Sequence, residues 1–324
     1  MESMWSSSSG RGMGGIQPSE YRLPAETRIG RVRLAVSDLQ KSLDFYTRVI
    51  GLTVKSGIET AEPSLARLGV EGEDQVLLEL QALPGTQAIG QQKRLGLYHA
   101  AYLLPSREAL SRFIEHLNAQ SVPFGASDHL YSEALYLTDP DGFAVEVYAD
   151  RPREEWRFEG EELLSGVFPL RLSELPRVAP GSWKGVPQGT TVGHVHFFVG
   201  DLEKAKTFYH RGLGLDLMTW RYSGALFASA GGYHHHVGLN IWAAGSPPAI
   251  ETEPRLLFWE LVLPDPDDID EVLLSLQREG HSRAHSDTNI TSVTDPWGIG
   301  VHLVSAPTTG RSDSGQNGIL REER

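Results

Sequence analysis

The sequence predicts an α+β protein built from four modules, each a strand, a helix and further strands. The first observation is a repeat: GRVRLAVSDLQKSLDFYTRVIGLTV at 30–54 aligns without gaps with GHVHFFVGDLEKAKTFYHRGLGLDL at 193–217. The second is another pair of related segments, LYHAAYLLPSREALSRFIEHL and LLFWELVLPDPDDIDEVLLSL, each a strand, a proline turn and a helix. The third is that both of these segments are followed by an Asp-Pro-x-Gly turn and a strand. Repeated units of this kind indicate a fold assembled from copies.

In the first repeat, the residues predict each element in order. Alternating apolar residues predict a strand. Asp38 and Asp201 follow it and can cap a helix of about three turns, and Gly51 and Gly214 end that helix. In the second repeat the Asp-Pro-x-Gly element is a turn that joins two strands.

The modules are expected at 28–88, 95–150, 190–243 and 255–305. One module cannot cover both faces of its own sheet, so the modules must pair. The expected domains are 28–150 and 190–305, joined by a polar, proline-bearing linker at 151–189 with one short helix. The tails 1–27 and 306–324 are expected to be unstructured.

Composition limits the function. The 324 residues carry a formal charge of −13, which argues against nucleic acid as a partner, since phosphate contacts need clustered Lys and Arg. No signal peptide or membrane-length apolar run is evident, so no membrane partner is expected. The absence of cysteine excludes disulfides and thiol nucleophiles and fits a cytoplasmic protein. A small-molecule partner is therefore expected.

Positions where the copies differ suggest a metal site. His194 stands where the sister copy has Arg31, and His99 corresponds to Phe258. Glu146 corresponds to His302. Two histidines and one carboxylate are the ligands of non-haem Fe(II) centres. The competing interpretation is that each histidine is a hydrogen-bonded core residue, as single histidines on apolar strands commonly are.

A run of three histidines, His234, His235 and His236, raises a separate question. If it lies in a strand, His234 and His236 face one side and His235 the other. Solvent-facing residues at a loop edge are the alternative.

These motifs resemble the vicinal oxygen chelate superfamily (glyoxalase, bleomycin resistance and dioxygenase proteins). The features that carry the resemblance are GHVHFFVGDLEKAKTFYHRGLGL, the Asp-Pro-x-Gly turn before a Glu-bearing strand, and GGYHHHVGLN. Within the superfamily, residues 28–305 resemble two-domain extradiol catechol 2,3-dioxygenases. The resemblance implies βαβββ modules paired into two cupped barrels, Fe(II) or alternatively Mn(II), and insertion of O2 beside the hydroxyls of an aromatic diol. A homodimer is also compatible with it.

The resemblance assigns residues one by one. It implies His99, Glu146 and His194 as metal ligands. It implies Tyr136, ten residues before Glu146, as a hydrogen-bond partner of the diolate, and a histidine from the triple-histidine run as the acid/base group. His236 is the first choice, with His234 and His235 as alternatives, and His129 is a further cavity residue.

One departure from the family pattern decides whether this assignment can hold. The commonest arrangement builds the metal barrel from modules three and four, but here the candidate ligands come from modules two and three. The inner modules must therefore pair. If modules one and two paired instead, His194 would be separated from the other two ligands.

Two alternatives remain. One is a glyoxalase-like isomerase or an epoxide-opening transferase of the same superfamily, which usually places a second carboxylate in the site. The other is a metal-free protein that sequesters an aromatic ligand between paired modules.

Overall fold

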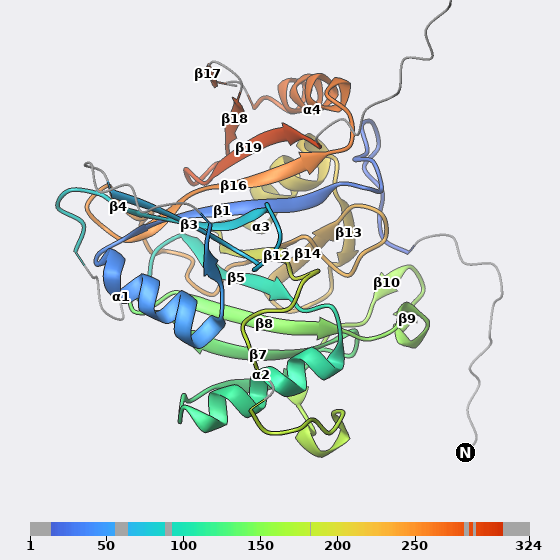
Figure 1. The fold of residues 1–324 in the computed structure, drawn as a ribbon. Coiled ribbons are helices and arrows are strands. Elements are labelled where there is room, and N and C mark those ends of the chain that lie inside the picture. The colour runs from blue at the N-terminus through green and yellow to red at the C-terminus, as the bar shows by residue number, and fades with distance from the viewer. Residues whose placement is uncertain are drawn as a thin grey trace, which may run out of the picture.

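Each of the four modules forms a strand, a helix and three further strands (Figure 1). The computed structural model describes residues 14–55, 64–87, 93–181, 183–281, 285–287 and 290–306. Module one contains β1 (Arg28–Val36), α1 (Leu39–Asp44), η1 (Phe45–Ile50), β2 (Thr53–Val54), β3 (Ser64–Gly69) and β4 (Val76–Ala82). Module two contains β5 (Gly96–Leu103), α2 (Arg107–Ala119), β6 (Gly125–Asp128), β7 (Ser132–Thr138) and β8 (Ala144–Asp150).

The second half of the chain repeats this order. Module three contains β12 (Thr191–Phe198), α3 (Leu202–Ala205), η4 (Lys206–Gly212), β13 (Asp216–Thr219), β14 (Ala225–Ser229) and β15 (Val237–Asn240). Module four contains β16 (Arg255–Leu263), α4 (Asp267–Arg278), β17 (His285–Asp287), β18 (Ile290–Thr294) and β19 (Gly300–Ser305). The predicted α+β class and the βαβββ modules are confirmed.

The modules pair inner with inner and outer with outer. The inner sheet is formed by modules two and three with one added strand, β11 (Phe168–Pro169). Its strand order is β11-β6-β7-β8-β5-β12-β15-β14-β13, and β5 and β12 run antiparallel at its centre. The outer sheet, from modules four and one, has the order β17-β18-β19-β16-β1-β4-β3-β2, with β1 and β16 antiparallel. Each sheet therefore contains strands from both halves of the sequence. The predicted domains at 28–150 and 190–305 describe units of the sequence repeat, and they stay a prediction.

The repeated helices begin where the capping residues predict. The Asp38 side chain accepts a hydrogen bond from Lys41 N, and Asp201 does the same for Lys204 N. In both repeats a short α-helix passes into a π-helical turn. A glycine with positive φ follows each turn, Gly51 at 92° directly after η1 and Gly214 at 90° two residues after η4.

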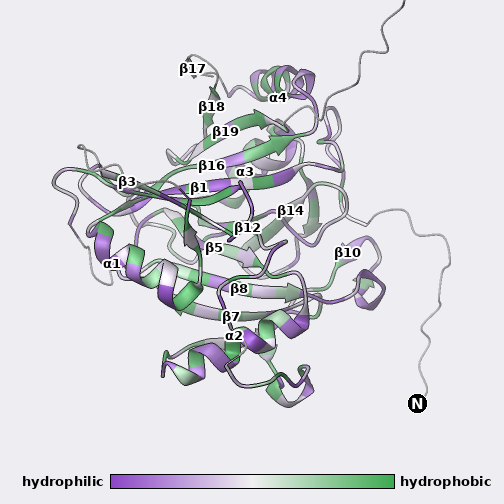
Figure 2. Cartoon of the chain, in the orientation of Figure 1, coloured by the Kyte–Doolittle hydropathy of each residue, from purple (hydrophilic) through white to green (hydrophobic). Residues whose placement is uncertain are grey.

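The main apolar cluster of the described residues lies between the sheets and their helices, and two smaller clusters lie apart from it. It includes residues from both sheets, among them Trp259 of β16 and Tyr102 of β5. Figure 1 shows α2 beside β7 and β8 and α4 beside the β18–β19 edge. Figure 2 shows mixed hydrophilic and hydrophobic residues along these helices, as expected when one face is buried.

Two segments differ from the expected tail and linker. Residues 14–27 pack against module three: Ile16 bridges to Leu217, and Arg22 forms a bidentate ion pair with Asp216. The tail positions 1–13 and 307–324 lie outside the described residues. The predicted linker contains η2 (Arg153–Glu155), β9 (Phe158–Glu159), β10 (Glu162–Leu163), β11 (Phe168–Pro169) and η3 (Leu172–Glu174).

The linker is thus part of the fold, because β9 and β10 form a hairpin and β11 extends the inner sheet beside β6. Within the described ranges, no helix has the length and apolar character needed to cross a bilayer.

Candidate active site

Three adjacent strands of the inner sheet bring the candidate metal ligands together. Ala101 of β5 is the register partner of Glu146 on β8 on one side and of His194 on β12 on the other. His99 lies two residues before Ala101 and so shares its face of the sheet. The pairing of the inner modules therefore gathers all three side chains on one face.

The donor atoms of these three side chains nearly touch. His99 Nε2 lies 3.1 Å and His194 Nε2 3.2 Å from Glu146 Oε2, and the two Nε2 atoms are 3.3 Å apart. The residues are 1–4% exposed. Three electron-rich atoms at this spacing, away from water, repel one another unless a proton or a cation lies between them.

The protonation states suit a cation. Burial opposes ionisation of Glu146, but the neighbouring imidazoles outweigh it and hold its pKa well below the ordinary value. Burial lowers the pKa of His194 to about 4, against the opposing effect of Glu146. At neutral pH His194 is therefore neutral beside a carboxylate anion, as metal ligation requires.

The other ring nitrogens, His99 Nδ1 and His194 Nδ1, are buried without a hydrogen-bond partner among the described residues. No described hydrogen bond therefore opposes the tautomer in which Nδ1 carries the proton and the lone pair of Nε2 points into the cluster. The two imidazoles and the carboxylate fit a divalent transition-metal ion.

A cavity of about 230 Å³ opens onto this cluster. Its lining is mostly aromatic and neutral: Tyr98, His99, Ser127, His129, Tyr131, Ser132, Tyr136, Glu146, Ser165, Gly166, Val167, His196, Tyr222, Phe227, His235 and Trp242. Residues 165–167 belong to the predicted linker, which therefore forms one wall of the cavity.

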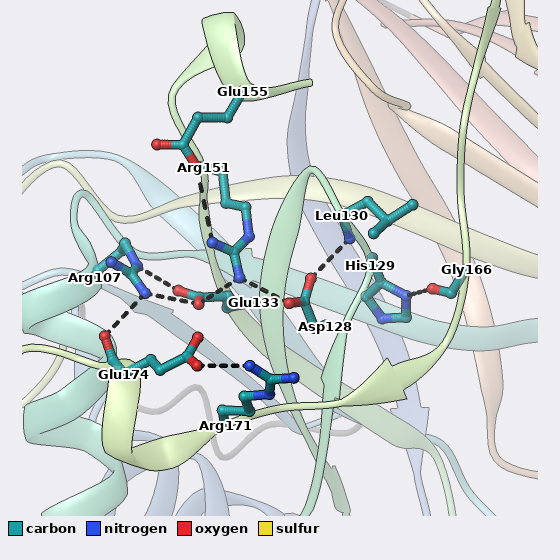
Figure 3. A network of polar contacts seen from close by, with 10 residues as sticks. All are labelled: Arg107, Asp128, His129, Leu130, Glu133, Arg151, Glu155, Gly166, Arg171 and Glu174. Carbon is teal, nitrogen blue, oxygen red and sulfur yellow. Dashed lines mark hydrogen bonds and ion pairs between the residues drawn. The ribbon is translucent and has the colours of Figure 1, made fainter. Parts of the chain in front are cut away.

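Tyr136 and His129, both predicted from sequence, form a hydrogen-bonded pair in this wall. The Tyr136 hydroxyl is 2.7 Å from His129 Nε2. His129 Nδ1 is 2.7 Å from the carbonyl oxygen of Gly166, a contact drawn in Figure 3. Burial, followed by the nearby charge of Glu146, raises the pKa of Tyr136 well above its ordinary value, so this phenol stays protonated.

An ion-pair network supports the wall from behind. Figure 3 shows the Glu133 carboxylate between Arg107 and Arg151, and Arg151 also reaches Asp128. Glu133 is 1% exposed and sits on β7, while Asp128 ends β6. The network therefore fixes β7, which carries Tyr136, and the end of β6, which His129 directly follows.

The three consecutive histidines precede β15 instead of lying in a strand, so the expected alternation is wrong. His235 lines the cavity, and its ring centroid lies 4.1 Å from that of His194. His234 is fully buried, with Nδ1 2.8 Å from His235 Nδ1 and Nε2 3.0 Å from Asp150 Oδ1. His236 faces a different cavity.

The first choice of His236 for acid/base chemistry therefore needs revision on geometric grounds. Its Nδ1 accepts a hydrogen bond from Ala230 N, and it does not line the cavity that opens onto the metal cluster. His235 is the member of the run that does.

Sequence analysis missed several cavity residues, His196 first among them. His196 follows His194 by two residues on β12 and so shares its face, a signal that the strand period could have provided. Its Nε2 lies 2.9 Å from Asn240 Nδ2. Tyr222 and Trp242 come from loops, which carry no periodic signal.

In the outer sheet the positions equivalent to the three candidate ligands are Arg31, Phe258 and His302, and Arg31 forms ion pairs there. Arg31 bonds Glu260 at 2.7 Å and Glu79 at 2.9 Å. The Phe258 and His302 rings stack at 3.8 Å between centroids. A guanidinium thus sits among the carboxylates of this sheet.

Comparison with known proteins agrees with the fold. The profile of the Glyoxalase/Bleomycin resistance protein/Dioxygenase superfamily matches residues 28–147 and 191–303. Catechol-2,3-dioxygenase of Bacillus subtilis is 39% identical over 280 residues, covering 84% of this chain and 94% of that protein.

Two solved structures show the same fold at low identity. A putative dioxygenase from Bacillus subtilis is 15% identical with a TM-score of 0.58, over 89% of this chain and 87% of the other. Glyoxalase I from Zea mays is 17% identical with a TM-score of 0.51, over 86% and 92% respectively. The chain belongs to the Glyoxalase/Bleomycin resistance protein/Dioxygenase superfamily and is an enzyme of the extradiol dioxygenase type.

Proposed function

We propose that this protein opens the ring of catechol or a related aromatic diol with O2, using a metal ion held by His99, Glu146 and His194. The observation that carries the proposal is the buried cluster of these three side chains at one end of an aromatic cavity. Similarity to catechol-2,3-dioxygenase over most of the chain supports the reaction type.

Fe(II) is the proposed metal, and Mn(II) is the alternative with the same ligand preference. When bound, such an ion lowers the pKa of the diol hydroxyls and offers open positions for diol and O2. The protein contributes the dry, shaped cavity and the protonation states around it.

Tyr136 acts as a hydrogen-bond donor to the diol. The Gly166 carbonyl accepts from His129 Nδ1–H, which leaves His129 Nε2 as an acceptor for the Tyr136 hydroxyl in the absence of substrate. When a diolate oxygen enters the cavity, the Tyr136 O–H can turn to this stronger, charged acceptor.

His235 acts as the proton acceptor and later the donor. Asp150 accepts from His234 Nε2–H, and in the tautomer with the proton on Nε2 the Nδ1 of His234 has a free lone pair. That lone pair accepts from His235 Nδ1–H, and the Nε2 of His235 is left unprotonated. Burial, together with neighbouring histidines, lowers the pKa of His235 well below its ordinary value, which keeps the ring neutral before substrate arrives.

The preferred diol is uncharged. Glu146 is the one Asp, Glu, Lys or Arg among the described lining residues, so a carboxylate on the ring would find no cationic partner. Two lining residues, Val167 and Trp242, are 64% and 43% exposed and give the cavity an apolar margin. Catechols with apolar substituents fit this surface.

The test is oxygen uptake by protein loaded anaerobically with Fe(II) after addition of catechol. We expect uptake with a yellow ring-cleaved product, loss of uptake and of bound iron in His99→Ala, and neither loss in His302→Ala. His302 lies on the outer sheet at the position that corresponds to Glu146, and so controls for removal of a histidine outside the candidate metal cluster. Iron retained by His99→Ala would contradict the ligand assignment.

Two other outcomes separate the alternatives. If iron binds but no tested diol consumes oxygen, the reaction class is wrong and a sister reaction of the superfamily takes its place. A wild-type protein that binds no metal would instead be a metal-free binding protein.

A further inference from the structure

A second cavity of about 200 Å³ lies where the triple-histidine run meets the start of β1 and β12. Its lining residues are Ala25, Thr27, Arg28, Ile29, Leu103, Arg153, Thr191, Val192, Gly193, Ala230, Tyr233 and His236. The cavity shares none of these residues with the one that opens onto the metal cluster.

The charged side chains of this cavity are both cationic. Arg28 and Arg153 line it, and neither forms an ion pair with any carboxylate in the described part of the chain. Among the described residues, Arg153 donates a hydrogen bond to the Gly231 carbonyl oxygen at 3.3 Å and lies over the rings of Trp156 and Tyr233. No Asp or Glu is among the described lining residues, although the protein carries a formal charge of −13.

The uncharged polar groups of the cavity add further donors. His236 Nδ1 accepts from Ala230 N at 3.1 Å, so the neutral ring carries its proton on Nε2, which has no partner among the described residues. Burial lowers the pKa of His236 to about 3, which keeps that tautomer neutral. Thr27 is 2% exposed, and its buried hydroxyl has no hydrogen-bond partner in the described structure.

We propose that this cavity is a binding site for a small oxyanion, held by Arg28 and Arg153 with His236 Nε2–H as a neutral donor. Two guanidinium groups, an imidazole N–H and hydroxyls complement a group that accepts hydrogen bonds on several oxygens. The absence of a described carboxylate in the lining removes the main competitor for the arginines. Inorganic phosphate and a simple carboxylate share this chemistry, and both fit the small volume.

The site does not depend on the proposed catalytic function. Tyr233 nevertheless links the two regions, because its hydroxyl contacts Tyr148 at 2.7 Å and Asp150 Oδ1 at 3.3 Å. Asp150 is the residue that contacts His234. An anion bound in this cavity therefore lies near Tyr233, which contacts Asp150, the hydrogen-bond partner of His234.

Calorimetric titration of the full-length, metal-free protein tests the proposal, with inorganic phosphate in one arm and acetate in the other. Chloride keeps the ionic strength constant, because non-specific attraction is screened by salt. We expect saturable binding to one site in at least one arm. The same binding in His99→Ala would show that the metal ligands do not hold the anion.

Variants separate a built site from general charge. The double variant Arg28→Gln with Arg153→Gln should weaken binding about tenfold or more, since each charge-assisted hydrogen bond is worth more than a neutral one. The control Arg171→Gln with Arg278→Gln removes the same charge from exposed positions and should leave binding unchanged. Thr27→Val retains the side-chain shape and tests the buried hydroxyl without a charge change.

Saturation by either anion supports the site and identifies the preferred geometry, tetrahedral for phosphate or planar for acetate. No saturation by either anion up to millimolar concentration would overturn the proposal. Equal weakening in the two double variants would also overturn it, because net charge alone would then explain the effect.

Discussion

The protonation of single side chains at this site depends on the hydrogen bonds that their other polar atoms make. His235 faces the cavity, but its tautomer depends on His234 and, through it, on Asp150. Each contact is short and each histidine is buried, so water cannot substitute for a missing partner. Asp150 is therefore a positioning residue. It contacts His234 and, through His234, affects which nitrogen of His235 carries the proton.

Replacing Asp150 tests this relay. In Asp150→Asn the carboxylate that retains the proton on His234 Nε2 is lost, and we expect kcat to fall roughly 10–100-fold, the usual cost of losing such a partner. Iron content should be unchanged, and the ¹⁵N NMR signals of His235 should report a changed tautomer. Asp74→Asn, which removes an equal charge from an exposed position away from the cavity wall, is the control. Unchanged kcat and tautomer in Asp150→Asn would contradict the relay.

At the scale of elements, the repeated motifs join modules that belong to different sheets. The Tyr46 hydroxyl after α1 donates to Asp139 Oδ2 at 3.1 Å, and Tyr209 donates to Asp295 Oδ2 at 3.0 Å. Each contact connects the helical segment of one module to the Asp-Pro-x-Gly turn of the next. The aromatic and turn motifs thus have a structural role, which explains why they occur in both halves.

These buried aspartates predict a pH dependence of stability. Burial raises the pKa of Asp139 to about 7 and that of Asp295 to about 6, both from an ordinary value of 3.8. Between the ordinary pKa of 3.8 and these raised values, the folded state therefore binds more protons than the unfolded state. The free energy of unfolding should fall by a few kcal/mol from about pH 4 to about pH 7, because each pKa unit corresponds to about 1.4 kcal/mol.

Chemical denaturation at several pH values measures this effect. Asp139→Asn keeps the side-chain shape but cannot ionise, so it should flatten the pH profile, and Asp295→Asn should do so at lower pH. The exposed Asp74→Asn serves as the control. A wild-type slope of the opposite sign that both variants abolish would show that these carboxyls are ionised in the folded protein.

Over the whole molecule, the two related sheets balance the charge of their buried carboxylates in different ways. The inner sheet gathers two imidazoles and a carboxylate, while the outer sheet surrounds the fully buried Glu79 with Arg31, Arg33 and Arg67. In the outer sheet a resident guanidinium supplies the positive charge that a metal ion supplies in our proposal for the inner sheet. The proposed chemistry is therefore confined to one sheet.

Loss of the Glu79 carboxylate should destabilise the protein strongly. Glu79→Gln leaves three guanidinium groups around a neutral amide, and breaking a buried pair on one side typically costs 3–5 kcal/mol. Glu174→Gln, at an exposed ion pair with Arg171, should cost less than about 1 kcal/mol. Urea denaturation measures both, and similar small losses would show that the outer cluster contributes little.

Metal should stabilise the protein through the inner sheet alone. At 100 times the dissociation constant, Fe(II) should add about 2.7 kcal/mol to the free energy of unfolding of the wild type. Anaerobic thermal scans should show a rise in Tm that depends on iron concentration, retained in His302→Ala and absent in His194→Gln. An equal rise in His194→Gln would place the metal elsewhere.

The sequence by itself predicted four modules of a strand, a helix and further strands, and the resemblance to the superfamily supplied their βαβββ order. The sequence also marked the three residues of the candidate metal cluster. Repeats, capping residues and turn motifs are local signals, and the differences between copies mark His99, Glu146 and His194 without any knowledge of contacts. The requirement that modules two and three pair also followed from the sequence, since only that pairing brings the three residues together.

Tertiary structure decided which sheet each module joins and which histidine of the run faces the cluster. His234, His235 and His236 lie outside β15, so strand periodicity could not assign their directions. The contributions of residues 165–167, Tyr222 and Trp242 depend on how loops fold over the sheet, and loops carry no period. The second cavity likewise exists only because residues 25–29, 153 and 191–193 meet in space.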